Sequence, residues 1–236
     1  MDTRCIAEYG ITNMVRCVIL ALCLLGCSSQ KTVLVLSKTA GWRHDSIETA
    51  VSTVQTICEE EGWNCIATED SSQLIAQEYD AIVFLSTTGD ILNEGEQNHL
   101  KKFIEKGGGF VGIHAAANTQ EEWNWFNENV LCAVFKRHDS VKPLVVDVVV
   151  RNHPSTTHLE ETWPRVDEWY VYDRIPQNVT VLLTIEDEDG FRPIAWCREV
   201  KDGKSFYTGG GHTKEAWAEP LFIEHIRGGI EWAITP

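Results

Sequence analysis

The chain has 236 residues, 43% hydrophobic and 23% charged, and a formal net charge of -15. This length supports one well-buried core, and the composition is that of a globular rather than a disordered protein. The charge argues against a nucleic-acid partner, because phosphate binding needs a basic face and the Lys and Arg residues are scattered.

The first feature in chain order is an apolar stretch at residues 17–25, preceded by a positive charge. It is typical of an export signal and is too short to span a bilayer comfortably. Because 24–27 resembles a bacterial lipobox, we expect a leader over residues 1–27 and lipidation of Cys27. The protein would then be exported and lipid-anchored, at the periplasm or the cell surface, with no other membrane contact. Met14 suggests a later translation start, and the alternatives are a buried first strand or an uncleaved anchor.

Residues 28–236 are predicted to form a single α/β domain. The run 32–37 is continuously apolar and of strand length, which is typical of a strand covered on both faces. Apolar residues at helical spacing follow, from a capping box at 45–48 to a stop at Gly62. Strands at 64–68 and 79–86 come next. This alternation of strands and helices predicts a parallel sheet.

A second capping pattern at 93–96 opens a helix that ends at 107–109, directly before a strand that ends on His114. The C-terminal half is rich in strands, which we expect to extend the sheet with antiparallel members. They are predicted at 143–150, 179–185, 193–200 and 204–208. A last helix begins at Pro220, a residue suited to a first helical turn.

Three histidines lie at or shortly after the ends of predicted strands: His44, His114 and His212. In doubly wound sheets, ligands bind beyond the carboxyl ends of the strands, so His44, residues 87–90 and His114 should lie at one edge. His114 ends a buried strand beside small residues, where a reactive side chain is readily presented; the alternative is a core histidine bonded to a backbone carbonyl. His212 follows three glycines, which indicates unusual backbone angles or a close backbone approach.

The sequence Asp-Glu-Trp-Tyr at 167–170 combines carboxylates with a phenol among aromatic side chains. Such groups bind sugars through hydroxyl hydrogen bonds and ring stacking, although an aromatic strand with a charged rim gives the same pattern. Further candidates for sugar binding lie in predicted loops: Trp42, Asp90, Asn118 and Trp217. Two histidines on predicted helices, His99 and His225, are expected to be solvated. His138 and His158 lie in polar segments that indicate no role.

The cysteines of the domain form no CxxC pair, which argues against a zinc ribbon or a thioredoxin-like site. They are Cys58, Cys65, Cys132 and Cys197. Core packing is the simplest interpretation for Cys58 and Cys65. Disulfides among the four stay open.

Five ordered blocks between residues 32 and 234 resemble the ThuA-like (trehalose utilisation) family: 41–45, 107–117, 167–170, 193–196 and 206–213. The resemblance implies the three-layer, flavodoxin-like fold of the class I glutamine amidotransferase superfamily. Active members of that superfamily carry a nucleophilic Cys where this chain has His114, so glutamine hydrolysis is not expected. His212 matches their catalytic histidine. At residues 114–118 this chain reads His-Ala-Ala-Ala-Asn where many relatives read His-Ser-Ala-Ala-Asp.

The family also implies sugar catabolism, acting on a disaccharide, a glycoside or a 3-keto-sugar, with a functional link to sugar oxidoreductases. The leading hypothesis is an enzyme without a cofactor that transfers protons on such a substrate, as an isomerase, lyase or hydrolase. His114 and His212 would be the acid/base pair, assisted by Glu168. Tyr170 would bind a hydroxyl or stabilise an enediolate, and His44 would bind the polar end of the sugar.

Two alternatives remain. His44, His114 and His212 converge from different strand ends and could hold a divalent metal ion with an open position for water, as in a metal-dependent hydrolase. The other alternative is a non-catalytic, carbohydrate-binding surface lipoprotein, because a fold alone does not establish an activity.

Overall fold

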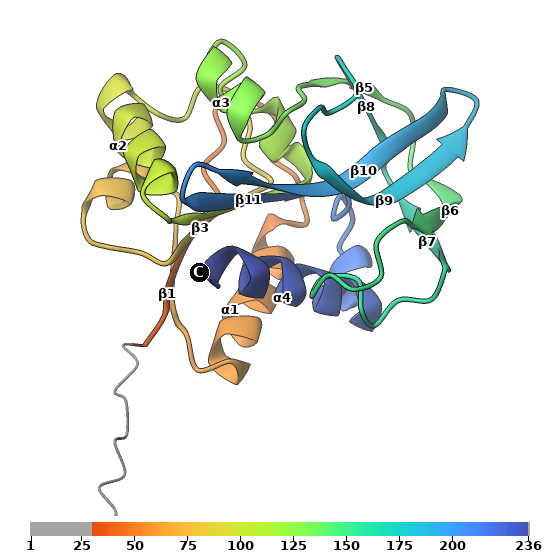
Figure 1. Ribbon diagram of the computed structural model, residues 1–236, viewed down its shortest axis with the longest axis horizontal. Helices are drawn as coiled ribbons and strands as arrows, with labels where there is room; N and C mark the ends of the chain where they lie inside the picture. Colours follow the sequence, from red (N-terminus) through yellow and green to blue (C-terminus); the bar gives the residue numbers. More distant parts are fainter. Residues whose placement is uncertain (1–29, 236) are drawn as a thin grey trace, which may run out of the picture.

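The computed structural model describes residues 30–235, so the predicted leader and Cys27 lie outside the described residues. These described residues form a nine-stranded sheet and a separate two-stranded ribbon (Figure 1). The order of strands in the sheet is β2-β1-β3-β4-β11-β10-β9-β6-β7. Within residues 30–235, none of the helices has the length and apolar character that a membrane span requires.

One half of the sheet is parallel and the other antiparallel. Parallel pairs join β2 (Asn64–Thr68), β1 (Thr32–Leu36), β3 (Ala81–Leu85), β4 (Gly109–Ile113) and β11 (Gly203–Thr208). Antiparallel pairs then add β10 (Gly190–Val200), β9 (Thr180–Asp187), β6 (Lys142–Val148) and β7 (Thr162–Asp167). The predicted fold class is therefore confirmed, including antiparallel strands from the C-terminal half.

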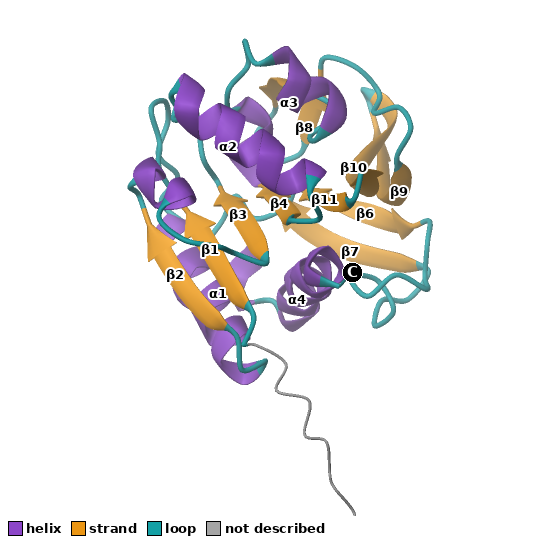
Figure 2. Ribbon diagram, turned by 60° about the vertical axis from the view of Figure 1, so that its left-hand side comes forward, coloured by secondary structure: helices purple, strands orange, loops and turns teal. Residues whose placement is uncertain are grey.

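Helices cover both faces of the sheet and make three layers (Figure 2). Helices α1 (Ile47–Glu60) and α4 (Pro220–Ile234) pack on one face, and α2 (Glu94–Glu105) and α3 (Asn124–Asn129) on the other. Each face of the sheet has its own hydrophobic core, and alternate residues of β1 pack into one core or the other. Val33 belongs to the core with α1 and α4, and Leu34 to the core with α2 and α3. This is why the run of apolar residues in β1 is unbroken.

The ribbon consists of β5 (Phe135–His138) and β8 (Tyr170–Tyr172), which pair antiparallel. Residues 30–235 also contain short 3₁₀ helices: η1 (Ser71–Ile75), η2 (His114–Asn118) and η3 (Ala216–Ala218). Because β8 follows β7 after only two residues, the chain passes directly from the edge of the sheet into the ribbon.

The two predicted capping boxes have different outcomes. The box that opens α2 is confirmed, because Asn93 and Glu96 exchange side-chain to backbone hydrogen bonds of 3.0 and 2.9 Å. The box at 45–48 is wrong, because α1 begins one residue later than that pattern requires. Ser46 is the residue before the helix, and its hydroxyl donates instead to the carbonyl of Gly211 at 3.3 Å. A tertiary contact has replaced the local cap.

His225 was predicted to be solvated on its helix, and this prediction is wrong. The side chain is fully buried, and its ring nitrogens lie 2.8 Å from the carbonyl oxygen of Ser155 and 3.1 Å from the hydroxyl of Thr208. Burial lowers the pKa of His225 from 6.5 to about 3. The imidazole is therefore neutral in the folded protein near pH 7.

This burial predicts a pH dependence of stability. Between about pH 3 and 6.5, His225 is neutral in the folded protein and takes up a proton when the protein unfolds. The contribution of His225 to the free energy of unfolding is therefore complete above pH 6.5 and falls as the pH is lowered. The slope is about 1.4 kcal/mol per pH unit. We expect urea unfolding of the wild type and of His225→Gln at pH 7.5, 6 and 5 to show that the difference between their free energies of unfolding shrinks as the pH is lowered. A difference that does not change with pH would contradict the prediction.

Candidate functional site

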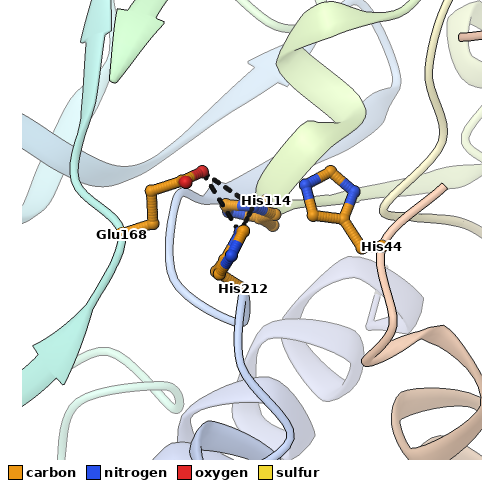
Figure 3. A group of neighbouring side chains, drawn as sticks. All are labelled: His44, His114, Glu168 and His212. Atoms are coloured by element: carbon orange, nitrogen blue, oxygen red, sulfur yellow. Dashed lines mark hydrogen bonds and ion pairs between the residues drawn. The ribbon is translucent and has the colours of Figure 1, made fainter. Parts of the chain in front are cut away.

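Four side chains from separate segments meet at the carboxyl edge of the parallel strands (Figure 3). His44 lies between β1 and α1, His114 directly after β4, Glu168 between β7 and β8, and His212 after β11. One nitrogen or oxygen atom of each lies within 4.8 Å of those of the others. We call these four residues the centre. The predicted gathering of His44 and His114 at one edge is observed, and Glu168 and His212 lie there too.

The tautomer of His114 follows from its contacts. The residue has a left-handed backbone with φ 50°, and its side chain is fully buried. Its Nδ1 lies 2.9 Å from the carbonyl oxygen of Gly209, which can only accept, so Nδ1 carries the proton. Burial, and next the neighbouring His44, keep the pKa of His114 well below 6.5. The neutral ring therefore presents the lone pair of Nε2 to the centre.

Three polar atoms surround this lone pair. The hydroxyl of Tyr170 lies 3.1 Å from Nε2 of His114, Nδ1 of His212 lies at 3.2 Å, and Oε2 of Glu168 lies at 3.6 Å. Burial, and then Glu168, raise the pKa of Tyr170 well above 10, so the phenol keeps its proton and can donate to Nε2. The phenol proposed from the sequence is thus in contact with His114.

His212 is the most exposed member, and a carboxylate accompanies it. Its Nδ1 lies 3.2 Å from Oε2 of Glu168, and this proximity raises the pKa of His212 above 6.5. Glu168 is almost completely buried. Its other oxygen, Oε1, lies 2.9 Å from Nδ1 of His138, a half-exposed residue of β5.

The glycines before His212 allow a close approach of the backbone, as predicted. Gly211 has φ +107°, and a Cβ on Gly210 would lie 2.6 Å from the guanidinium of Arg165. Asp167, fully buried, accepts hydrogen bonds from the backbone N–H of Gly211 at 2.8 Å and of His212 at 3.1 Å. Arg165 lies 3.1 Å from Asp167. This ion pair fixes the segment that carries His212.

Two buried atoms of the centre have no hydrogen-bond partner among the described residues: Nδ1 of His44 and Oε2 of Glu168. The ring of His44 packs edge-on against those of His114 and His212, with centroids 4.8 and 5.1 Å away. Burial, and then His212, lower the pKa of His44 to about 4. The centre therefore contains nitrogen and oxygen atoms that could coordinate a metal ion.

A cleft of about 340 Å³ opens beside the centre. Its lining includes His44, His212 and Trp42, whose side chain is 73% exposed and accessible to a ligand. Trp217 is only 2% exposed, and its indole N–H donates to the carbonyl of Gly211 at 3.0 Å. Trp217 thus packs against the glycine segment, residues 209–211, and does not line the cleft. Asp90, which is exposed, and Asn118, which is half-buried, lie outside the centre.

The sequence did not predict three features of the site. These are the contact of His138 with Glu168, the hydrogen bonds of Asp167 to the backbone before His212, and the ion pair of Asp167 with Arg165. No local pattern marks His138, because its contact with Glu168 depends on the pairing of β5 with β8 across more than 30 residues. Asp167 was noted as a carboxylate for a sugar, whereas its oxygens bind backbone N–H groups. Buried charged residues such as Arg165 and Asp167 require a partner, but the sequence does not name it.

A three-layer α/β sheet with polar side chains beyond the carboxyl ends of its parallel strands is the architecture of flavodoxin-like ligand-binding and catalytic proteins. Within this class, the family model ThuA, described as trehalose utilisation, matches residues 32–233. The chain belongs to this family. The resemblance inferred from the sequence blocks is therefore confirmed, and with it a role in trehalose or sugar utilisation.

Solved structures agree with the fold. A ThuA-like protein from Bacteroides uniformis is 23% identical, with a TM-score of 0.73 over 86% of this chain and 91% of that one. Another from Parabacteroides merdae is 19% identical, with a TM-score of 0.71 over 87% and 90%. A β-galactosidase from Bacillus circulans is 11% identical, with a TM-score of 0.56 over 87% of this chain and 30% of that one. No curated protein matches the chain.

Proposed function

We propose that this chain is an enzyme of sugar utilisation that acts on a disaccharide, a glycoside or a 3-keto-sugar by proton transfer, as an isomerase, lyase or hydrolase. The observation that carries the proposal is the lone pair of His114 Nε2, held with the Tyr170 hydroxyl and His212 at 3.1 and 3.2 Å. Family membership supports the substrate class. An imidazole has no thiolate to form an acyl-enzyme, so glutamine hydrolysis is not part of the proposal.

The cleft beside the centre suits a sugar. A pyranose ring could stack on the exposed indole of Trp42 while its hydroxyls bind His44 or His212. A carbonyl or hydroxyl of the sugar would then lie near His212, which lines the cleft and contacts the buried His114 at 3.2 Å. A 3-keto-sugar is the product of an oxidation, which would link this reaction to a sugar oxidoreductase.

Two chemistries fit this geometry. In one, the imidazoles of His114 and His212 transfer the protons themselves along the chain of contacts with Tyr170. In the other, the centre holds a divalent ion that polarises a sugar oxygen. Both require His114, His212 and Glu168.

The test combines binding with product analysis. The protein would be titrated calorimetrically with trehalose, other disaccharides, glycosides and their 3-keto forms, and each mixture examined for products by mass spectrometry. We expect turnover that falls at least about 100-fold in His114→Ala and His212→Ala. His99→Gln, an exchange on α2 outside the centre, is the matched control and should keep the wild-type rate.

Full activity in both exchanged proteins would overturn the assignment of the centre. Tight binding of a sugar that stays chemically unchanged would instead favour the carbohydrate-binding lipoprotein and overturn the enzyme.

We also propose that the protein is exported and lipid-anchored through Cys27, which rests on the sequence alone. Intact mass spectrometry of the protein from its native membrane should give a mature chain that begins at Cys27 and carries acyl groups. A soluble chain that retains residues 14–26 would contradict this prediction.

A further inference from the structure

We infer that the centre binds one divalent transition-metal ion, with His44, His114, Glu168 and His212 as its ligands. This inference deepens the proposed function and rests on it for its catalytic meaning. Within residues 30–235, the centre is the one group of three or more His, Cys, Asp or Glu side chains arranged closely enough to hold an ion. A single ion per chain is therefore expected.

The spacing of the ligand atoms agrees with tetrahedral coordination. Metal–nitrogen and metal–oxygen bonds of about 2.0–2.2 Å place neighbouring ligand atoms about 3.3–3.6 Å apart. Nε2 of His114 lies 3.2 Å from Nδ1 of His212 and 3.6 Å from Oε2 of Glu168. Nδ1 of His212 lies 3.2 Å from Oε2 of Glu168. These three atoms already form one face of such a site.

The outer contacts orient the ligands as in known metal sites. Metal-binding histidines usually donate their other ring N–H to a carbonyl or a carboxylate, which fixes the ring and leaves the second nitrogen free. His114 does so through Nδ1 and the carbonyl of Gly209. Oε1 of Glu168 lies 2.9 Å from Nδ1 of His138, which also contacts the carbonyl oxygen of Asp139 at 2.9 Å, while Oε2 lies toward the centre, 3.2 Å from His212.

The unpartnered atoms are the second observation. Oε2 of Glu168 and Nδ1 of His44 are buried and form no hydrogen bond among the described residues, and such atoms are costly to bury. Oε2 has only its ion-pair contacts with His212 and His114, at 3.2 and 3.6 Å. An ion in the centre would satisfy the carboxylate oxygen directly. It would also replace the contact between His114 and His212 by two coordinate bonds.

The ligand types select the class of ion. Three imidazoles with one carboxylate suit Zn²⁺, Mn²⁺, Fe²⁺, Co²⁺ or Ni²⁺, whereas Ca²⁺ and Mg²⁺ prefer oxygen ligands alone. The cleft beside His44 and His212 would give a sugar oxygen access to the ion. The ion would accept that oxygen as a fifth ligand, as catalytic zinc sites can, and would act on it as a Lewis acid. Tyr170 would then be the proton donor that is not itself a ligand.

The first experiment measures the ion itself. Protein purified without a histidine tag would be stripped with a chelator, reloaded separately with Zn²⁺, Mn²⁺, Fe²⁺, Co²⁺ or Ni²⁺, and analysed by elemental mass spectrometry. We expect about one ion per chain for at least one metal, and a Co²⁺ absorption spectrum characteristic of nitrogen and oxygen ligands. Less than about a tenth of an ion per chain with every metal would overturn the inference.

Exchanges then locate the ion. We expect Glu168→Gln and His44→Ala to weaken binding of the metal at least about 100-fold, measured by competition with a chromophoric chelator. Loss of an outer contact typically costs 10–100-fold, so His138→Ala should fall in that range. His138→Asn retains a donor near the position of Nδ1 and should bind nearly as well as the wild type. His99→Gln is the control, and circular dichroism confirms that each protein is folded.

The outcomes separate this inference from the proposed function. Unchanged affinity in both Glu168→Gln and His44→Ala would overturn the metal centre. A metal-free protein that still turns over a sugar, and loses that activity in His114→Ala, would also overturn it while the proposed function stands. An ion bound as expected with no sugar turned over would support the centre and overturn the proposed function.

Discussion

Exchange of Asp167 for alanine is expected to lower the free energy of unfolding by about 3–5 kcal/mol. The carboxylate is fully buried, accepts hydrogen bonds from two N–H groups of the glycine segment and lies 3.1 Å from Arg165, whose side chain is 2% exposed. Its removal leaves a buried guanidinium with one carboxylate partner fewer and three backbone donors without this acceptor, the N–H groups of Glu168, Gly211 and His212. Urea unfolding at pH 7 measures the change.

The control for this exchange is Asp147→Ala, since Asp147 is exposed on β6 and the change should stay within about 0.5 kcal/mol. If Asp167→Ala does not fold, Asp167→Asn keeps one acceptor oxygen without the charge and should cost about 1.5–3 kcal/mol. If the free energy of unfolding of either Asp167 variant lies within about 0.5 kcal/mol of the wild-type value, the contacts of Asp167 with Arg165 and with the backbone of Gly211 and His212 do not stabilise the fold.

For Tyr170→Phe, we expect kcat to fall about 100- to 10,000-fold on the sugar identified in the turnover experiment. The exchange removes one hydroxyl, which lies 3.1 Å from Nε2 of His114 and is the nearest buried donor that is not a proposed ligand. The ring stays in place, so the metal content should not change and stability should fall by only about 1 kcal/mol. Steady-state kinetics and elemental analysis of the same sample measure both quantities.

The matched control is Tyr79→Phe. This residue is also buried, and its hydroxyl donates to the carbonyl of Gln73 at 2.7 Å, away from the centre. It should retain kcat within about threefold. Equal kcat values for Tyr170→Phe and Tyr79→Phe would remove Tyr170 from the chemistry.

Much of the fold could be predicted because burial on both faces leaves a clear pattern. The unbroken apolar runs of β1 and β3 and the helical spacing of α1 arise from a sheet covered by two layers of helices. The position of His114 at a strand end follows from the same pattern. The cap of α1 could not be predicted, because the hydroxyl of Ser46 is used by Gly211, 165 residues away.

The site could be predicted only where strand ends mark it. Three residues of the centre follow strands of the parallel half: His44, His114 and His212. Because the carboxyl ends of parallel strands lie at the same edge of the sheet, their proximity could be predicted. The contact of His138 with Glu168 depends on a ribbon whose pairing has no local signal. For His114, the alternative of a core histidine bonded to a backbone carbonyl describes the contact of Nδ1, while Nε2 faces the centre, so this contact does not exclude the functional role, which stays a prediction.

The four groups of the centre come from segments that span residues 44 to 212, so that no short stretch of the unfolded chain contains the complete set. An ion would therefore bind to the folded protein and not to the unfolded chain. Its binding free energy would then be added to that of folding, by about 2.7 kcal/mol when the free ion is at 100 times its dissociation constant. The melting temperature should accordingly depend on the concentration of free metal, and ion uptake during refolding would report the moment at which the two halves of the sheet have come together.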